Sequence, residues 1–313
     1  MRLVTFTAGE ELLLGAKVDE GIINLNMGYI AYLHSRGEKD PYNKGGELIP
    51  DDMKRFLEMG GPALRAAEQT VDFCHKRIKT VKGPRGERIL YPEAEVKLKA
   101  PIPRPGKIIC LGLNYRDHAE EAKAKVPPHP VIFSKFATAV IGHEDPILYP
   151  KICRQLDYEI ELAFIIGKGG RDIPEEEAYD HIAGYTIFHD VSARDIQFAD
   201  KQWTRGKTLD TFAPMGHYLV TRDEIPDPHN LTMKLRVNGK VMQDSNTKNM
   251  IFKIPYIVAF LSQGITLEPG DVIATGTPAG VGIFRKPPAL LQVGDVVELE
   301  IEGLGILRNH IVA

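Results

Sequence analysis

The chain contains few cysteines, with only Cys74, Cys110 and Cys153 among its 313 residues. Their wide separation excludes the short spacings of zinc sites, and three thiols do not make a disulfide framework. We interpret them as reduced structural thiols, which are typical of proteins inside the cell.

Charge of one sign and long apolar runs are also scarce. The formal net charge is −3, so no strongly basic surface is expected, and this excludes a general nucleic-acid binder. No apolar run reaches the roughly 18 residues that a membrane span needs, and the N-terminal segment lacks the hydrophobic core of a signal peptide. We therefore expect a soluble, cytoplasmic protein with no nucleic-acid or membrane partner. Import into an organelle is the alternative that these features leave open.

A proline-rich segment, APIPRPGK, divides the chain. Pro101, Pro103 and Pro105 stiffen this segment into an extended connector. It predicts a small N-terminal domain over residues 1–100, with a role in packing or assembly, and a catalytic domain over residues 105–313. Apolar residues make up 43% of the chain, which is enough for packed cores in both parts.

The N-terminal part predicts both strands and helices. The segments RLVTF and GIINLN are typical of strands, and DDMKRFLEMGGPALRAAEQTVDFCHKRI is typical of a helical segment. We expect Asp51 to cap this segment, and Gly60, Gly61 and Pro62 to break it into two helices.

The C-terminal part is dominated by short strands and turns. LRVNGKVM predicts a hairpin with its turn at Asn238 and Gly239. Helices are expected in PEEEAYDHIAGY and around Pro255 in NMIFKIPYIVAFLSQGI. Strands outnumber helices and do not follow a βαβ order, so the predicted fold class is β-rich α+β.

The stretch LDYEIELAFIIG carries three carboxylates within an apolar strand. The two-residue period of a strand places Asp157, Glu159 and Glu161 on one face. Two carboxylates about 6 Å apart repel each other by roughly 3 kcal/mol at an effective dielectric constant of about 20. Such a row indicates either a solvent-facing edge strand or a bound cation. With Asp190 in TIFHDVSARD as a third ligand, Glu159 and Glu161 predict an oxygen-only site, which selects magnesium, calcium or manganese over zinc.

Cationic and amide side chains follow Asp190. Arg194 and Gln197 are three residues apart, so one helical turn would direct them the same way. Arginine binds carboxylates through two parallel hydrogen bonds, which favours an anionic substrate near the metal. Lys207 in WTRGKTLD is a further candidate. Ordinary surface positions are the alternative for these side chains.

Two other motifs are candidates for chemistry. His118 and Glu121 are three residues apart in NYRDHAEE, where the glutamate could orient the histidine and raise its basicity. A solvated helix face is the alternative. The loop ATGTPAGVG lacks the residue order of nucleotide-binding loops, but backbone amides around Thr277 could hold an anionic group.

Taken in order, the motifs GLNYRDHAEE, PVIFSKF, DYEIELAFIIGKGGRDI, HDVSARD, GKTLDTFAPMG and ATGTPAGVG resemble the fumarylacetoacetate hydrolase family. The resemblance extends from about residue 105 to the end. The N-terminal unit resembles that of fumarylacetoacetate hydrolase domain-containing proteins and their bacterial relatives. The resemblance implies a mixed β-roll with a small α/β N-terminal domain, and commonly a homodimer.

The resemblance also implies roles for individual residues. It implies a divalent metal, usually Mg²⁺ with Mn²⁺ and Ca²⁺ as alternatives, and a small 2-oxo acid as substrate. Asp157 would be a neighbour of the metal site. The implied roles are metal binding for Glu159, Glu161 and Asp190, catalysis for His118, Glu121 and Lys207, and substrate binding for Arg194, Gln197 and Thr277.

We expect a Mg²⁺-dependent hydrolase that cleaves a carbon–carbon bond in a small 2,4-dioxo acid of the acylpyruvate type, through a metal-stabilised enolate. The first alternative is an oxaloacetate decarboxylase or an oxaloacetate keto–enol tautomerase. The second is an isomerase or decarboxylase of 2-oxo acid intermediates from aromatic degradation. A metal-binding protein without catalytic activity is the alternative from a different class.

Overall fold

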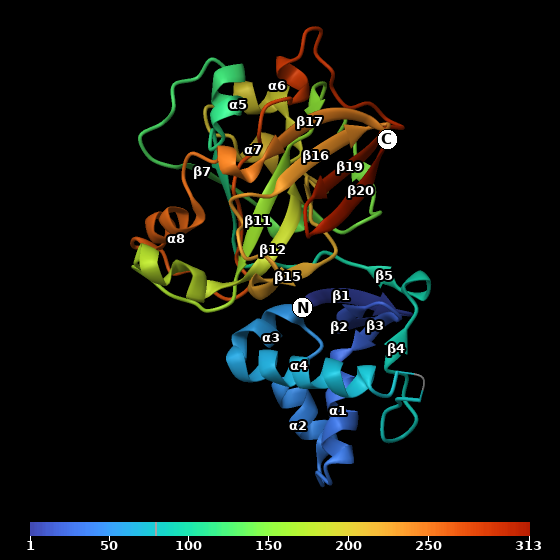
Figure 1. The fold of residues 1–313 in the computed structure, drawn as a ribbon. Coiled ribbons are helices and arrows are strands. Elements are labelled where there is room, and N and C mark those ends of the chain that lie inside the picture. The colour runs from blue at the N-terminus through green and yellow to red at the C-terminus, as the bar shows by residue number, and fades with distance from the viewer. Residues whose placement is uncertain (79) are drawn as a thin grey trace.

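The computed structural model describes residues 1–78 and 80–313. Figure 1 shows an elongated molecule with the N-terminal elements gathered at one end. These elements are β1 (Arg2–Ala8), β2 (Glu11–Val18), β3 (Gly21–Asn24), α1 (Leu25–Ser35), α2 (Pro41–Leu48), α3 (Met53–Glu58), α4 (Gly61–His75), β4 (Leu90–Tyr91) and β5 (Lys97–Leu98).

The longer C-terminal part holds most of the strands. Its first half comprises β6 (Ile108–Gly112), α5 (Arg116–Glu121), β7 (Val131–Lys135), β8 (Val140–Ile141), β9 (Ile147–Leu148), β10 (Leu156–Asp157), β11 (Ile160–Ile166) and β12 (Ile182–His189). Its second half comprises β13 (Ser192–Ala193), α6 (Arg194–Ala199), α7 (Thr204–Lys207), β14 (Ala213–Pro214), β15 (Leu219–Thr221), β16 (Thr232–Val237), β17 (Lys240–Asn246), α8 (Ile254–Ser262), β18 (Val272–Ala274), β19 (Val296–Ile301) and β20 (Gly305–Val312).

One large sheet runs through both parts of the molecule, in the strand order β4-β3-β2-β1-β15-β12-β11-β18-β6-β7, with β5 paired to β1. A second sheet has the order β17-β16-β19-β20-β9. Parallel pairs (β18 with β6, β20 with β9) occur beside antiparallel ones. Because the sheets are mixed and helices do not alternate with strands, the predicted β-rich α+β class is confirmed.

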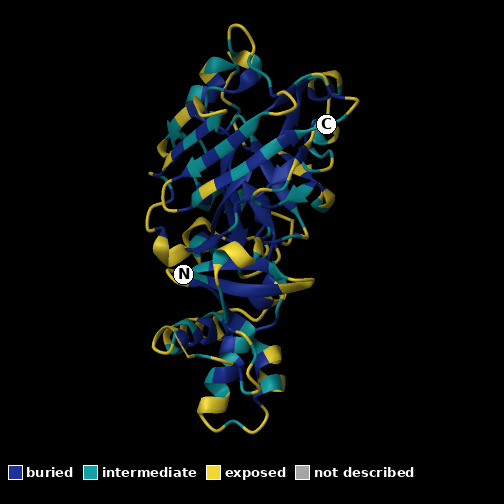
Figure 2. Ribbon diagram, turned by 90° about the vertical axis from the view of Figure 1, so that its right-hand side faces the viewer, coloured by how far each residue is buried: buried dark blue, intermediate teal, exposed yellow. Residues whose placement is uncertain are grey.

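Strand β11 lies at the centre of the core. It pairs with β12 on one side and β18 on the other, and all of its residues are buried. Figure 2 shows buried residues concentrated along the strands and exposed residues in the loops and outer helices. A strand buried on both faces reads as a nearly continuous apolar run, which is the pattern of LAFII.

The predicted domain division stays a prediction. Residues 100–105 lie between β5 and β6, outside regular elements. However, β1 pairs with β15, with Leu3 opposite Leu219, so a single sheet joins the N-terminal and C-terminal parts. No helix in the described part of the chain is both long and apolar enough to cross a membrane.

Several local predictions need correction in the N-terminal part. Asp51 does not cap α3, because the neighbouring Asp52 is the N-cap residue and accepts a hydrogen bond from the Arg55 amide at 2.8 Å. The predicted break between α3 and α4 is confirmed. The strand predicted in GIINLN ends at Asn24, whose side chain accepts a hydrogen bond from the Met27 amide and caps α1.

In the C-terminal part, the hairpin at Asn238 and Gly239 is confirmed, with φ angles of +50° and +77° that suit a tight two-residue turn. The helix predicted in PEEEAYDHIAGY is only a short 3₁₀ segment, Glu175–His181, before β12 begins. The helix around Pro255 is confined to α8, with the proline in its first turn, where a backbone N–H is not needed.

A half-buried histidine lies where the N-terminal strands meet the C-terminal part. The His217 ring packs at 4.7 Å from His143 and at 3.9 Å from Tyr218, measured between ring centroids. Its Nδ1 atom is buried without a hydrogen-bond partner. Burial and the neighbouring His143 lower the pKa of His217 to about 4. The folded protein therefore holds this ring neutral.

This histidine predicts a loss of stability in mild acid. An unfolded histidine takes up a proton near pH 6.5, whereas folded His217 takes it up only near pH 4. As pH falls through this window, the free energy of unfolding should decrease by about 2–3 kcal/mol. Urea unfolding at pH 7 and pH 4.5 should show a smaller decrease in His217→Gln. The exposed His34→Gln control should behave as wild type, and equal decreases in all three proteins would contradict the assignment.

Candidate active site

Three carboxylates converge at the start of β11 and the end of β12. Oxygen atoms of Glu159, Glu161 and Asp190 all lie within 4.8 Å of one another, and all three residues are buried. The pairing of Ile160 with His189 brings the two strands together, and the Asp190 amide donates to the Glu159 carbonyl at 3.0 Å. The solvent-facing edge strand is therefore excluded, and the predicted ligand set is brought together.

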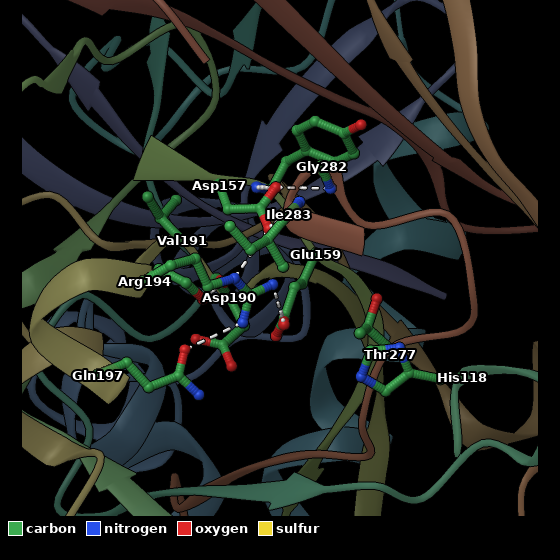
Figure 3. A network of polar contacts seen from close by, with 12 residues as sticks. His118, Asp157, Glu159, Asp190, Val191, Arg194, Gln197, Thr277, Gly282 and Ile283 are labelled. Atoms are coloured by element: carbon green, nitrogen blue, oxygen red, sulfur yellow. Dashed lines mark hydrogen bonds and ion pairs between the residues drawn. The ribbon is translucent and has the colours of Figure 1, made fainter. Parts of the chain in front are cut away.

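Two buried cations contact this group. Lys207 Nζ lies 2.8 Å from Glu159 Oε2 and 2.7 Å from Asp190 Oδ2. Arg194 Nη2 lies 2.6 Å from Glu159 Oε1, and its Nε lies 2.8 Å from Asp157 Oδ2. Figure 3 shows Arg194 between these carboxylates, with its third contact directed to Gln197. The cations and carboxylates form one connected network.

The buried charges do not cancel. When all of these groups are ionised, the four buried carboxylates of Asp157, Glu159, Glu161 and Asp190 face the three buried cations of Lys135, Arg194 and Lys207, which leaves one formal negative charge in excess. Among residues 1–78 and 80–313, no cation forms an ion pair with Glu161, which accepts a hydrogen bond from the Gly276 amide at 2.8 Å. Burial, Asp190 and Glu159 raise the pKa of Glu161 well above its usual value. An all-oxygen donor set with excess negative charge fits a hard divalent cation.

The positions of Arg194 and Gln197 follow the predicted geometry. Both lie on the single turn of α6, and Arg194 Nη1 donates to Gln197 Oε1 at 3.0 Å. The Nε and Nη2 groups of the arginine are already bound to Asp157 and Glu159. A substrate carboxylate would therefore have to compete with Asp157 and Glu159 for the two parallel hydrogen bonds predicted from the guanidinium. The side-chain amide of Gln197 lies beside the guanidinium.

His118 and Glu121 are held against the glycine-rich loop. On α5, His118 Nδ1 lies 3.5 Å from Glu121 Oε2. Both Glu121 oxygens accept a hydrogen bond from the Gly280 amide, at 3.0 Å each. The solvated helix face is excluded for His118, because its side chain is about 90% buried and its ring packs against Phe284 at 6.0 Å. The pair therefore has the geometry that the sequence predicted.

The glycine-rich loop binds protein groups. Thr277 Oγ1 donates to the Ile160 carbonyl at 2.9 Å and accepts from Gln243 Nε2 at 2.9 Å. The amides of Gly276 and Gly280 are occupied by Glu161 and Glu121. The loop therefore anchors β11 and α5. Because these two amides already bind protein carboxylates, they do not form the expected binding site for a free anion.

Lys135 is a site residue that the sequence reasoning missed. From the end of β7, its Nζ lies 2.6 Å from Asp190 Oδ1 and donates to the carbonyls of Val191 at 3.0 Å, Phe212 at 2.7 Å, and Lys207. The signal was a lysine at an inward-facing position of the strand VIFSK, where burial requires an ionic partner. Lys135 therefore fixes Asp190 and the backbone beside Lys207 at once.

These residues line one small cavity. Its volume is about 140 Å³. The polar lining comprises His118, Glu159, Glu161, Arg194, Gln197, Lys207 and Thr277, and the aromatic lining comprises Phe133, Phe198, Trp203 and Phe284. All predicted site residues except Glu121 and Asp190 therefore reach the cavity wall, and those two contact residues that do.

Replacing Lys135 should destabilise the protein strongly. The substitution Lys135→Met leaves Asp190 without one of its two cations and removes the donor to three carbonyls. The free energy of unfolding should fall by about 3–5 kcal/mol, as when a buried ion pair loses one partner. Urea unfolding measures it. The exposed Lys125→Met control should stay within about 0.5 kcal/mol of wild type; a similar effect in both variants would contradict the role of Lys135.

Glu161 should be required for metal binding and dispensable for folding. Glu161→Gln keeps the side-chain shape and an oxygen acceptor for the Gly276 amide, but removes the negative charge that no cation neutralises. Calorimetric titration with Mn²⁺ and Mg²⁺ should show affinity reduced by at least about 100-fold, beyond the loss typical of outer-shell changes. The melting temperature without metal should not fall. The exposed Glu120→Gln control should bind as wild type; unchanged binding in Glu161→Gln would disprove the ligand assignment.

Comparison with known proteins identifies a matching family and a relative that is similar over the whole chain. The family model of the fumarylacetoacetate (FAA) hydrolase C-terminal domain matches residues 107–312. "Oxaloacetate tautomerase fahd2, mitochondrial" of Xenopus laevis is 45% identical over 318 residues, which cover 100% of this chain and 90% of that protein.

Solved structures agree with this result. The fumarylacetoacetate hydrolase from psychrophilic Exiguobacterium antarcticum superposes with a TM-score of 0.79 at 35% identity, covering 100% of this chain and 99% of that one. The 2-hydroxyhepta-2,4-diene-1,7-dioate isomerase from Mycobacterium marinum superposes with a TM-score of 0.70 at 32% identity, covering 100% and 98%.

The comparison corrects the predicted location. The cytoplasmic assignment is wrong by this criterion, because the Xenopus laevis relative, similar over the whole chain, is named as mitochondrial. Cysteine usage and net charge reflect folding and solubility, and they do not encode a compartment.

The predicted family resemblance is confirmed, since the family model covers about two-thirds of the chain and the similarity to relatives extends over its full length. The chain belongs to the fumarylacetoacetate hydrolase family, a family of enzymes.

Proposed function

We propose that the protein is an oxaloacetate keto–enol tautomerase that uses a divalent cation, Mg²⁺ in the first instance. The observation that carries this proposal is 45% identity over the whole chain to a protein named as an oxaloacetate tautomerase. The comparisons thus favour the tautomerase alternative over the carbon–carbon hydrolase that the sequence predicted. The proposed partner is a small 2-oxo acid, and the homodimer expected from the family stays a prediction.

The proposed reaction moves one proton within the substrate. In the keto form of oxaloacetate, a C–H bond at C3 breaks and its electron pair forms the C2–C3 double bond. The carbonyl oxygen at C2 then takes up a proton and becomes the enol hydroxyl. Charge and atoms balance without any co-reactant. Water does not attack the substrate, and this absence of attack separates the reaction from hydrolysis.

His118 is the proposed proton carrier. Among the residues that line the cavity, it is the histidine, and an imidazole ring can both accept and donate a proton through its two nitrogens. Glu121 Oε2 lies 3.5 Å from Nδ1 without a hydrogen bond between them, and the Gly280 amide holds the glutamate in this position beside the ring. General acid–base catalysis of this kind contributes about 10²- to 10⁴-fold in rate.

The remaining site residues bind the acid and its developing negative charge. Lys207 and Arg194 place two positive charges beside the carboxylate cluster, and Gln197 adds an amide at the cavity wall. When bound by Glu159, Glu161 and Asp190, a divalent cation would stabilise negative charge on the oxygens of the 2-oxo acid.

One second candidate has structural support. The structure from Mycobacterium marinum covers the whole chain at 32% identity and is named as an isomerase of 2-hydroxyhepta-2,4-diene-1,7-dioate. An isomerase of 2-oxo acid intermediates would use the same proton carrier. The two candidates differ in substrate length, which can be measured directly.

The activity should depend on His118. Wild type with Mg²⁺ should accelerate the decay of enol-oxaloacetate absorbance, and excess chelator should abolish the acceleration. His118→Ala should reduce kcat by about 10²- to 10⁴-fold, and His118→Ala should still bind Mn²⁺, because the carboxylates are unchanged. The exposed His75→Ala control should retain full activity.

Proton NMR of the products separates the alternatives. Acetate with pyruvate from acetylpyruvate would indicate the hydrolase, and pyruvate from oxaloacetate would indicate the decarboxylase. No acceleration of any of these reactions in the Mg²⁺-loaded protein would contradict the proposal and favour a non-catalytic metal-binding protein.

A further inference from the structure

A second part of the cavity wall is aromatic and carries no charge. Phe133 comes from β7, and Trp203, the only tryptophan of the chain, directly precedes α7. Both line the cavity that holds Arg194 and Lys207. The proposed reaction uses the charged and polar side chains of the cavity, and none of its steps involves the aromatic side chains. Their packing, however, restricts the space available to a substrate.

The Trp203 ring is seated on Gly112 at the end of β6. A Cβ atom at position 112 would lie 2.4 Å from Cζ3 and 3.0 Å from Cη2 of the indole. Real Cβ atoms do not approach a neighbour so closely, so the ring can occupy this position only because residue 112 is glycine. The contact places the indole directly against the backbone of β6.

Phe133 supports the ring from the side. The two rings meet nearly edge to face, with centroids 5.7 Å apart and an interplanar angle of 67°. Phe133 also lies beneath Lys207 Nζ, which is 5.1 Å from its ring centroid. Trp203, Phe133 and Gly112 thus form a rigid wall, which we call the aromatic wall, and this wall directly adjoins the cation that contacts the carboxylate cluster.

The cavity is small for a ligand site. Its volume of about 140 Å³ lies well below the roughly 300–1,000 Å³ of pockets for drug-sized ligands. The cationic groups of the lining, those of Arg194 and Lys207, are both at the reactive end. A longer substrate would have to extend along the uncharged wall, and Trp203 is the largest side chain there.

We propose that Trp203, seated on Gly112 and supported by Phe133, sets the upper limit of substrate chain length and selects four- and five-carbon 2-oxo acids over longer ones. The inference rests on the proposed function for the class of substrate. It adds the residue that determines specificity within that class.

The test compares short and long substrates in matched variants. The rate constant kcat/KM for enol–keto interconversion is measured with oxaloacetate, acetylpyruvate and the longer 2,4-dioxooctanoate. Trp203→Ala should raise the ratio of kcat/KM for dioxooctanoate to that for acetylpyruvate at least about tenfold, because one methylene group in an apolar pocket is worth about 10- to 200-fold. Trp203→Phe should raise it less. Trp203 is half-buried, so both variants are expected to fold.

Phe136→Ala is the matched control. This phenylalanine is 56% exposed and does not line the cavity, so its removal should leave the ratio unchanged. A second readout comes from the single tryptophan, whose fluorescence in wild type should change when acetylpyruvate saturates the site. An unchanged ratio in Trp203→Ala and Trp203→Phe, both with wild-type melting curves, would overturn the inference. If Trp203→Ala does not fold, Trp203→Phe and the fluorescence titration decide.

The two proposals fail separately. If wild type hydrolyses acetylpyruvate and has no effect on enol-oxaloacetate, the tautomerase proposal fails, while the ratio between the two dioxo acids still measures the length limit through hydrolysis. If wild type interconverts oxaloacetate and already accepts dioxooctanoate as well as acetylpyruvate, the tautomerase proposal stands and the length limit fails.

Discussion

The structure depends on the neutralisation of buried charge at the start of β11. Four carboxylates are buried at or beside this strand, and they face cations from three separate elements: Lys135 from β7, Arg194 from α6 and Lys207 from α7. Removing an ion from water costs several kcal/mol even after relaxation. The sheet pairs β11 with β12, and the cations reach the carboxylates from the end of β7 and from the two helices that follow β12. The ion pairs that make burial of these carboxylates tolerable are therefore the same contacts that position the site residues.

The loop after β18 extends this network to the other side of the cavity. Its amides donate to three carboxylates: Gly276 to Glu161, Gly280 to Glu121, and Gly282 with Ile283 to Asp157. A Cβ atom at position 282 would lie 2.4 Å from Asp157 Oδ1, so glycine is required where the backbone approaches the carboxylate. The loop joins the metal-site strand to α5, and the orientation of His118 is thereby linked to the charge cluster.

This arrangement explains why one site can serve several reactions. The carboxylate cluster, the two cavity cations and the histidine can bind a 2-oxo acid and manage a proton and a developing negative charge. Hydrolysis, decarboxylation and tautomerisation all need these groups, and they differ in whether water or carbon dioxide takes part. Full-length similarity favours tautomerisation here, and the shape of the aromatic wall bears on which acids reach the reactive end.

The sequence alone determined the local features. Alternating acids in DYEIEL, the Asn238 and Gly239 turn, and the three-residue spacing of His118 and Glu121 depend on periods that neighbouring residues fix, and the structure shows each of these geometries. The order of motifs also indicated the family and the fold class. These patterns could be read because a strand or a helical turn places side chains without reference to the rest of the chain.

Only the tertiary structure decided which charges meet. Lys135 lies 55 positions before Asp190, and the sequence of its own strand does not predict which carboxylate it contacts. The same holds for Arg194, whose guanidinium is taken by Asp157 and Glu159, and for Trp203, which rests on a glycine 91 residues earlier. Such contacts arise from strand order and the packing of distant segments, which sequence periodicity does not record. The sequence thus identified the carboxylate cluster and the His118–Glu121 pair, and the fold supplied their neutralising partners and the size of the cavity.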